Sequence, residues 1–234
     1  MFIGVSGLIG AGKSTLTRQL AEELGHRAYD KTDLLSHPLR VPKWKAVFEP
    51  VETNPYLEDF YLNIERWTFN MQMFLLARRF QQHQEVVWDP CHRRGGGVVQ
   101  DRTIYEDTIF ARMHHDDGLM VGRDWETYST HFHVMQSFLR YPDVILYLRV
   151  SPETALRRIK ERARTEEQGK VPLAYLQSLY EGYEGFVKEI GKYTVVVPVE
   201  WEDYAPVGQV ADLIKETLEG SPPPKYLRDM GRVL

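Results

Sequence analysis

The stretch GLIGAGKST at residues 7 to 15 contains the residue types that hold phosphate groups. Gly7 is followed by four residues and then by Gly12, Lys13 and Ser14, which is the spacing of a phosphate-binding loop. In such a loop, backbone N–H groups at a helix N-terminus surround phosphate oxygens, the lysine neutralises charge and the serine hydroxyl can bind Mg²⁺. We therefore expect a bound nucleoside triphosphate, with contacts from Gly7, Gly10, Gly12, Lys13, Ser14 and Thr15.

Two further groups of polar residues suit the transfer of a phosphoryl group. Glu49 stands in FEPVETNPY, at the end of a short predicted strand, and is a candidate general base toward a hydroxyl, with Glu52 as the alternative. Asp101 and Arg102 end another predicted strand in QDRTIYED. We expect Arg102 to hold the reacting oxygen and the phosphoryl group, and Asp101 to hold Mg²⁺ through water.

A charged connection, RRIKERARTEEQGKVPLAYLQ, is the third candidate segment. Arg158, Arg162 and Arg164 lie on or just after a predicted helix end, ahead of Gly169. A run of this kind on its own is usually a solvated helix face. Here the irregular spacing suits a lid that closes over phosphates, where arginine makes bidentate contacts and stabilises charge in the transition state.

The composition narrows the class of protein. The chain has 234 residues, is 43% apolar and 26% charged, carries a net charge of -4 and contains one cysteine. This is an ordinary globular balance, without a dense basic cluster for nucleic acid, a disulfide framework or an apolar run long enough to span a membrane. We expect a cytoplasmic protein with no nucleic-acid or membrane partner.

Hydrophobic patterning predicts the elements that position these residues. Short strands are expected at 2–6, 46–49, 98–101, 144–150 and 194–199, and helices at 13–24, 54–63, 66–83, 104–113, 125–139, 152–163, 172–190 and 207–219. Strands that alternate with helices indicate an α/β fold: a five-stranded parallel sheet with helices on both faces. Such a sheet places ligands beyond the carboxyl ends of its strands, where the candidate segments stand.

The motifs, in this order, resemble those of the deoxynucleoside kinase family, which includes deoxyguanosine, deoxyadenosine and deoxycytidine kinases. The resemblance runs from the phosphate loop to about Tyr183, and the form DRTIYED is most similar to the bacterial purine enzymes. It implies a P-loop kinase fold in one domain at 1–220, an Arg-rich lid at about 158–170 and a tail at 221–234. It also implies transfer of the ATP γ-phosphate to the 5'-hydroxyl of a deoxynucleoside, with ATP and Mg²⁺, by a homodimer.

The resemblance also implies roles for individual residues. Tyr61 and Glu167 match residues that bind the sugar 3'-hydroxyl, and Gln72 matches the glutamine that pairs with the base edge. Phe110 matches the aromatic that stacks on the base, although the family commonly has one more residue between the Asp-Arg pair and this position. Arg162 and Arg164 match lid arginines, which are catalytic together with Lys13, Glu49 and Arg102. Arg158 and Arg162 would also contact ATP.

Arg79 and Asp107 bear on the choice of base. In the family, an arginine and an aspartate at these positions occur in the purine and deoxycytidine kinases, whereas thymidine kinases have small or apolar residues. A guanidinium suits the N7 and O6 acceptors of a purine, and Asp107 can hold it or accept from an exocyclic amine. The resemblance therefore favours deoxyadenosine or deoxyguanosine as substrate, with a deoxycytidine-preferring or broad enzyme as the alternative.

Two other classes of function remain open at this stage. A nucleoside-monophosphate kinase of the thymidylate type shares the fold and the loop, but Glu49 would repel the acceptor phosphate. A non-enzymatic scaffold is also possible, although Lys13, Glu49 and Arg102 are all present. The paired histidines at 114, 115, 131 and 133 lack ligand spacing. We expect the dimer contact in the segments 108–113 and 125–139, and the adenine near 201–206.

Overall fold

A computed structural model describes residues 1–30, 43–49, 54–89, 91, 95–162 and 171–220 of the chain. Its centre is a five-stranded sheet in the order β2-β3-β1-β4-β5, and every pair of neighbouring strands is parallel. The strands are β1 (Phe2–Gly7), β2 (Trp44–Val47), β3 (Gly97–Asp101), β4 (Val144–Arg149) and β5 (Val195–Glu200). The predicted sheet is confirmed.

Continuous apolar runs explain why the central strands form. All residues of β1 and β3 are buried, as are the first five residues of β4, so each strand is covered on both faces. Such strands read as uninterrupted Val, Ile and Leu because neither face meets water. Register follows from this burial, with Ile3 beside Val99 on one side and Val144 on the other.

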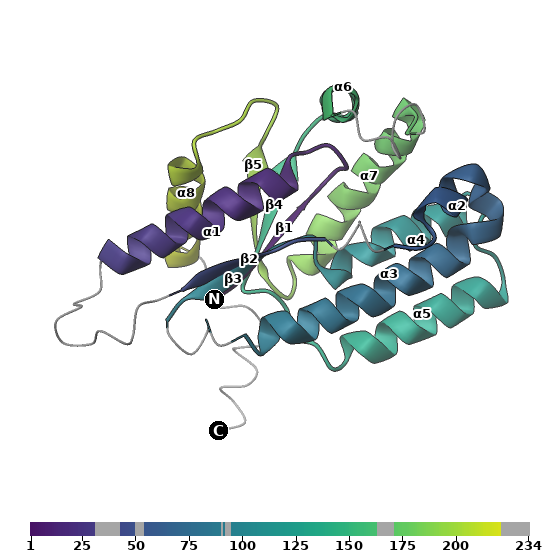
Figure 1. The fold of residues 1–234 in the computed structure, drawn as a ribbon, viewed down its shortest axis with the longest axis horizontal. Helices are drawn as coiled ribbons and strands as arrows, with labels where there is room; N and C mark the ends of the chain where they lie inside the picture. Colours follow the sequence, from purple (N-terminus) through teal and green to yellow (C-terminus); the bar gives the residue numbers. More distant parts are fainter. Residues whose placement is uncertain (31–42, 50–53, 90, 92–94, 163–170, 221–234) are drawn as a thin grey trace.

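Helices cover both faces of the sheet (Figure 1). The helices α1 (Lys13–Asp30) and α8 (Val207–Gly220) lie on one face and contact each other. On the other face lie α3 (Ile64–Val87), α4 (Asp107–Asp116) and α7 (Leu173–Ile190), with α5 (Arg123–Gln136) packed against α3. Shorter pieces complete the described chain: α2 (Leu57–Leu62), the 3₁₀ turn η2 (Ile104–Glu106) and α6 (Pro152–Arg162).

Several element ends differ from the sequence prediction for local reasons. The helix α1 continues past Gly25 because Arg27 in its last turns binds α8, through Asp212 and the Gly208 carbonyl. The helix α2 begins at residue 57 rather than 54, since the Asn54 side chain accepts a hydrogen bond from the Tyr56 N–H and forms a turn. The strand β2 ends at Val47, so its prediction at 46–49 was displaced by two residues.

The carboxyl ends of the five strands meet along one edge of the sheet. The phosphate loop follows β1, Glu49 follows β2 by two residues, and Asp101 ends β3. The segment that leads into α6 follows β4, and the segment 201–206 follows β5. This edge is where an open parallel sheet binds its ligands. The fold thus gathers the predicted segments from five separate parts of the chain.

Candidate active site

The loop after β1 has the backbone of a phosphate cradle. Gly7, Gly10 and Gly12 all have positive φ, which side chains with a Cβ rarely adopt. At Gly10 an added Cβ would also lie 2.5 Å from the carbonyl oxygen of Ala155, so the loop packs directly on α6. The Lys13 ammonium is buried and donates to the carbonyls of Gly7 (3.0 Å) and Leu8 (2.8 Å). Burial, reinforced by the nearby Arg102 charge, lowers its pKa to about 8.

The predicted metal residues Ser14 and Asp101 contact each other beside this loop. The Ser14 hydroxyl donates to Asp101 Oδ2 at 2.5 Å, while the buried Oδ1 has no hydrogen-bond partner. One hydroxyl and one carboxylate fit Mg²⁺, which takes few protein ligands and completes its shell with water and substrate phosphates. The described residues contain no group of three or more His, Cys, Asp or Glu side chains that could hold a metal without substrate.

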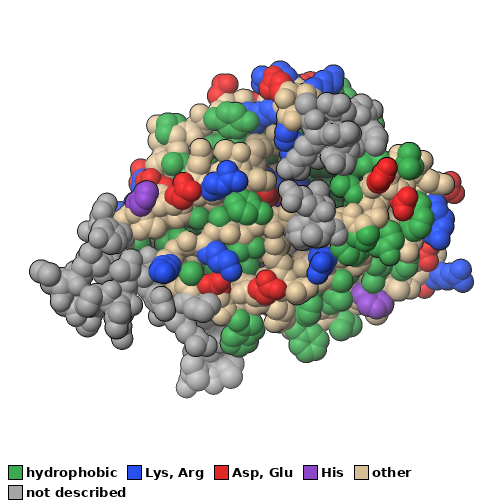
Figure 2. Space-filling model, in the orientation of Figure 1, with side chains coloured by type: hydrophobic (Ala, Val, Ile, Leu, Met, Phe, Trp, Pro, Cys, Tyr) green, Lys and Arg blue, Asp and Glu red, His purple; other side chains and the backbone are tan. Residues whose placement is uncertain are grey.

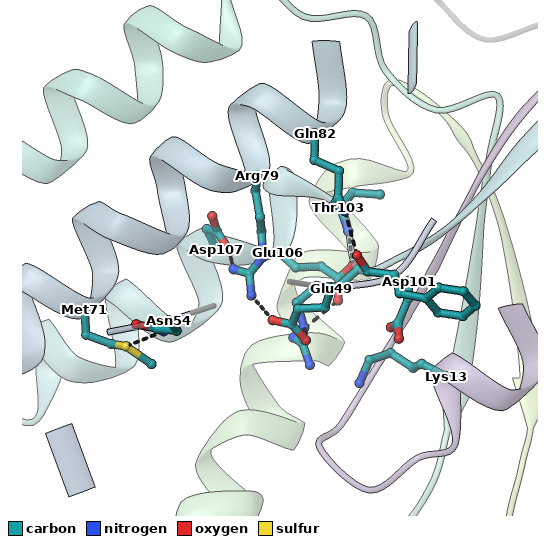
Figure 3. A network of polar contacts seen from close by, with 12 residues as sticks. Lys13, Glu49, Asn54, Met71, Arg79, Gln82, Asp101, Thr103, Glu106 and Asp107 are labelled. Atoms are coloured by element: carbon teal, nitrogen blue, oxygen red, sulfur yellow. Dashed lines mark hydrogen bonds and ion pairs between the residues drawn. The ribbon is translucent and has the colours of Figure 1, made fainter. Parts of the chain in front are cut away.

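Glu49 forms ion pairs with two arginines, and Figure 3 shows the one with Arg79. Its Oε1 forms an ion pair with Arg79 of α3, and its Oε2 lies 3.4 Å from Arg102 Nε. Burial alone would raise the pKa of Glu49, but the charges of Arg79, Arg102 and Lys13 together lower it to about 2. The carboxylate is therefore ionised at neutral pH. The Gln82 amide donates to the carbonyl of Phe48 (2.6 Å) and fixes the segment that carries Glu49.

Arg102 has a strained backbone at the end of β3. Its φ is +63°, the only positive value for a non-glycine among the described residues, and its N–H donates to the Val5 carbonyl at 3.0 Å. Strain of this kind persists only where surrounding contacts enforce it, and it is common at functional sites. The guanidinium is buried, faces Glu49 and lies 4.7 Å from the centre of the Phe110 ring.

Unpaired polar atoms lie on the α3 side of the site. Arg79 bridges Glu49 and Asp107, so one guanidinium joins the candidate base to α4 (Figure 3). Gln72, seven residues before Arg79 on the same helix, is buried, and its Oε1 has no hydrogen-bond partner. Asp107 Oδ2 is equally buried and lacks one. Leaving such atoms unsatisfied costs free energy, which a bound ligand with complementary groups would recover.

The side of the loop that faces α8 carries a groove of about 760 Å³. It runs between the face of α1 and the segment after β5, and its lining includes Gly12, Thr15, Trp201 and Tyr204. Arg158 of α6 is buried beneath it and donates to the carbonyls of Ala11, Trp201 and Glu202, with its guanidinium 4.3 Å from the centre of the Tyr204 ring. This arginine joins the loop to the segment after β5.

A model of the deoxynucleoside kinase family matches residues 3–217, almost the whole chain. The chain belongs to the deoxynucleoside kinase family. It is 42% identical over 217 residues to the deoxyadenosine kinase of Dictyostelium discoideum, covering 93% of this chain and 79% of that protein. It is 38% identical over 205 residues to the deoxyadenosine/deoxycytidine kinase of Bacillus subtilis, covering 86% and 83%.

Solved structures of this family share the fold. The deoxyadenosine kinase from M. mycoides with bound dATP has a TM-score of 0.72 at 29% identity, over 94% of this chain and all of that chain. The same enzyme with bound dCTP gives 0.70. The predicted P-loop kinase fold and the membership of the family are thus confirmed, and the chain is a deoxynucleoside kinase. No helix within the described part of the chain is both long and apolar enough to cross a membrane.

The kinase brings most of its predicted site residues to one edge of the sheet. One network of charges contains Lys13, Glu49, Arg79, Asp101 and Arg102, and Asp107 and Phe110 adjoin it. Gln72 is buried two turns before Arg79 on α3. Tyr61 is half-buried on α2, and Arg162 lies exposed at the last residue of α6. Glu52, Arg164 and Glu167 lie outside the described residues, as does most of the predicted lid. The roles assigned to all of these side chains remain predictions.

Sequence reasoning missed three side chains of this kinase that complete the network. Glu106 and Tyr183 contact Arg102, and Gln82 holds the segment before Glu49. Glu106 lies within the quoted stretch QDRTIYED, but nothing in its spacing distinguishes it from a solvated acid. Tyr183 is 81 residues from Arg102, and only the packing of α7 against α4 brings the two together.

Proposed function

We propose that this kinase transfers the γ-phosphate of ATP to the 5'-hydroxyl of a purine deoxynucleoside. The observation that carries the proposal is the Glu49 carboxylate, held by Arg79 and Arg102 at the strand edge that also carries the phosphate loop. Among the purines we place deoxyadenosine first, because the relatives from D. discoideum and B. subtilis are named for that substrate.

In the proposed reaction, Glu49 accepts the proton of the 5'-hydroxyl as that oxygen attacks the γ-phosphorus, and ADP leaves. Lys13, with its backbone loop, neutralises the phosphates of the donor. Arg102 faces both Glu49 and the position of the transferring phosphoryl group. Its positive charge therefore stabilises the negative charge that develops on that group. Arg162 and Arg164 would add positive charge from the lid. When bound, Mg²⁺ would be held by Ser14 and Asp101 and would neutralise phosphate charge.

The nucleoside would lie between α3 and α4. Gln72 presents an unpaired buried amide oxygen, which suits a base edge that both donates and accepts. The ion pair of Arg79 and Asp107 would meet the same edge, with the exocyclic amine of adenine donating to the unpaired Asp107 Oδ2. Thymine offers no exocyclic amine and no N7 acceptor, so its methyl group would contact a buried charged pair.

The sugar and the donor base have separate candidate positions. Tyr61 and Glu167 would bind the 3'-hydroxyl of the sugar. Phe110, which faces the Arg102 guanidinium, would lie against the nucleobase. The adenine of ATP would occupy the groove between α1 and the segment 201–206, which the Tyr204 ring lines, and the buried Arg158 guanidinium lies 4.3 Å from the centre of that ring. We also propose that the kinase is a homodimer. We place it in the cytoplasm, because a single cysteine suits a reducing compartment.

Specificity constants for four deoxynucleosides, with ATP as donor, test the proposal. Deoxyadenosine or deoxyguanosine should rank first, deoxycytidine should be tolerated and thymidine should be poor. Ribonucleosides should react less well, because a 2'-hydroxyl would lie unpaired or clash beside the groups that bind the 3'-hydroxyl. First place for thymidine would overturn the purine assignment, and turnover of monophosphates alone would favour the thymidylate type of kinase.

A further inference from the structure

Glu106 is a buried carboxylate that the proposed reaction does not use. It ends the 3₁₀ turn after β3 and is 0% exposed. Its Oε1 accepts hydrogen bonds from the Ser6 hydroxyl (2.8 Å) and the Thr103 N–H (2.9 Å), and its Oε2 accepts from the Tyr183 hydroxyl (2.9 Å). Burying a carboxylate is costly unless its oxygens are satisfied, and here both oxygens have partners. Ser6 lies directly before the phosphate loop, so Glu106 links that loop to the turn after β3.

Tyr183 lies between Glu106 and Arg102. Its hydroxyl donates to Glu106 and accepts from Arg102 Nη1 at 2.5 Å, whereas the guanidinium itself is 3.6 Å from Glu106. Burial, the largest cause, raises the pKa of Tyr183 well above its usual value, so the hydroxyl keeps its proton. A neutral group therefore holds one nitrogen of the arginine in place.

The contacts of Arg102 restrict where its guanidinium can point. Glu49 takes Nε, Tyr183 takes Nη1 and the Phe110 ring lies against the guanidinium. Within the described residues Nη2 has no partner, so it is available to phosphoryl oxygens. With φ at +63°, the backbone of Arg102 would relax if these contacts were lost.

We propose that Tyr183 and Glu106 are positioning residues that hold Arg102 aimed at the transferring phosphoryl group. The inference rests on the proposed role of Arg102 and extends it to α7, the helix that carries Tyr183. Because Glu106 also binds Ser6, the same carboxylate sets the position of the arginine relative to the phosphate loop. The pair acts on the reaction only through Arg102 and touches no substrate.

Tyr183→Phe tests the proposal by removing one hydroxyl while keeping the ring. A hydrogen bond to a charged group that matters in the transition state is worth roughly a ten- to hundredfold change in kcat. We expect that loss in kcat, with KM for deoxyadenosine and for ATP changed by less than about threefold. Tyr147→Phe is the matched control. Tyr147 stacks on Tyr183 with ring centres 6.0 Å apart and donates to Glu184 (3.1 Å), so its hydroxyl lies outside the network.

A double-mutant cycle separates positioning from a general structural role. In an Arg102→Met background, with product measured in single turnovers at excess enzyme, Tyr183→Phe should change the rate by less than about twofold. If Tyr183→Phe lowers the rate in the Arg102→Met background by the same factor as in the unmodified enzyme, the proposal is overturned. An unchanged kcat in Tyr183→Phe alone would also overturn it. Should Tyr183→Phe fail to fold, Glu106→Gln provides the same test of kcat against KM. Failure of the proposed function is distinguishable, because the unmodified kinase would then phosphorylate no deoxynucleoside.

Discussion

The Glu49 carboxylate is stabilised as an anion by three cations before any substrate binds. A pKa of about 2 makes it a weak base in the free enzyme. Donor phosphates that bind Lys13 and Arg102 would offset two of those charges, and the basicity of Glu49 would rise when ATP is in place. The base would thus become effective only in the complex that can react.

Replacement of this carboxylate by an amide tests its role. Glu49→Gln keeps the size of the side chain but cannot accept the 5'-hydroxyl proton. We expect turnover to fall by about 10² to 10⁴, with the affinity for deoxyadenosine little changed, as measured by steady-state kinetics and by titration calorimetry. A variant that retained most of its turnover would transfer the role to Glu52 or remove it.

Arg79 is the largest of the three charges that lower the pKa of Glu49, so its removal should change the response of the enzyme to pH. The pKa of Glu49 is lowered from 4.5 to about 2. Its carboxyl group is therefore ionised above about pH 2, and the negative charge is lost only as the pH falls through that value. Arg79→Met removes the first of the charges that lower the pKa, while burial, which raises it, remains. The acid limb of the kcat/KM profile should therefore move to higher pH.

The matched control for this profile is Arg78→Met. Arg78 precedes Arg79 on α3 but is exposed and bonds Gln81 (3.4 Å), away from Glu49. Its profile should coincide with that of the unmodified enzyme. The pH midpoint of the acid limb does not depend on the maximum value of kcat/KM. Weaker nucleoside binding in Arg79→Met therefore does not obscure the result. A limb that stayed in place would show that Arg79 does not control the ionisation of Glu49.

At the scale of elements, α6 ends in an arginine that belongs to the predicted lid. Arg162 is the last residue of the helix and is exposed. If it stabilises the transferring group, Arg162→Ala should lower kcat by about 10² to 10³ and raise the nucleoside KM far less. Arg157→Ala is the control, since Arg157 is exposed on the same helix and lies 3.6 Å from Glu161. An effect confined to KM would mean that Arg162 binds only the ground state.

The order of the elements could be predicted from sequence because each follows from a local pattern. Apolar runs identify β1, β3 and β4, and the Gly-rich loop places Lys13 and Ser14 at the start of a helix. The first and last residues of helices and strands depend on weaker sequence signals. The predicted helix at 13–24 ends before Gly25, yet α1 continues because Arg27 binds α8, a contact 181 residues away in the chain.

The same limit applies to the site. Glu49, Arg102 and Asp107 could be identified because they follow strands and because the motifs resemble a known family. The resemblance also paired Arg79 with Asp107, and the two side chains form an ion pair. The contact of Arg79 with Glu49 depends on how α3 packs over the strand edge, which no local spacing encodes. Tyr183 was unpredictable for the same reason, since its hydroxyl matters only through a contact made by tertiary packing.

For the whole molecule, two exposed apolar side chains near the end of α5 bear on the proposed dimer. Val134 of α5 is 56% exposed and Phe138, one turn later, is 72% exposed. In Figure 2, hydrophobic side chains gather at the middle of the lower edge of the molecule, where α3 and α5 end in Figure 1. Patches of this kind on a protein surface mark contacts with another molecule. We propose that this molecule is a second copy of the chain, because the family resemblance implies a dimer contact in the segments 108–113 and 125–139.

A pair of substitutions on this surface tests the dimer. Val134→Ser with Phe138→Ser removes apolar area without touching the network around Glu49, so the variant should sediment as a monomer where the unmodified kinase sediments at twice the mass. Leu213→Ser is the control: Leu213 is exposed on α8, which lies on the other face of the sheet from α5. It should leave the dimer intact.

Two outcomes would contradict the proposed dimer contact. If the double variant sediments as the same dimer as the unmodified chain, the end of α5 is not the contact. If the unmodified chain is itself a monomer, this apolar surface binds no second copy. Because the charge network around Glu49 is built within one chain, turnover per chain should fall less than tenfold in the monomer.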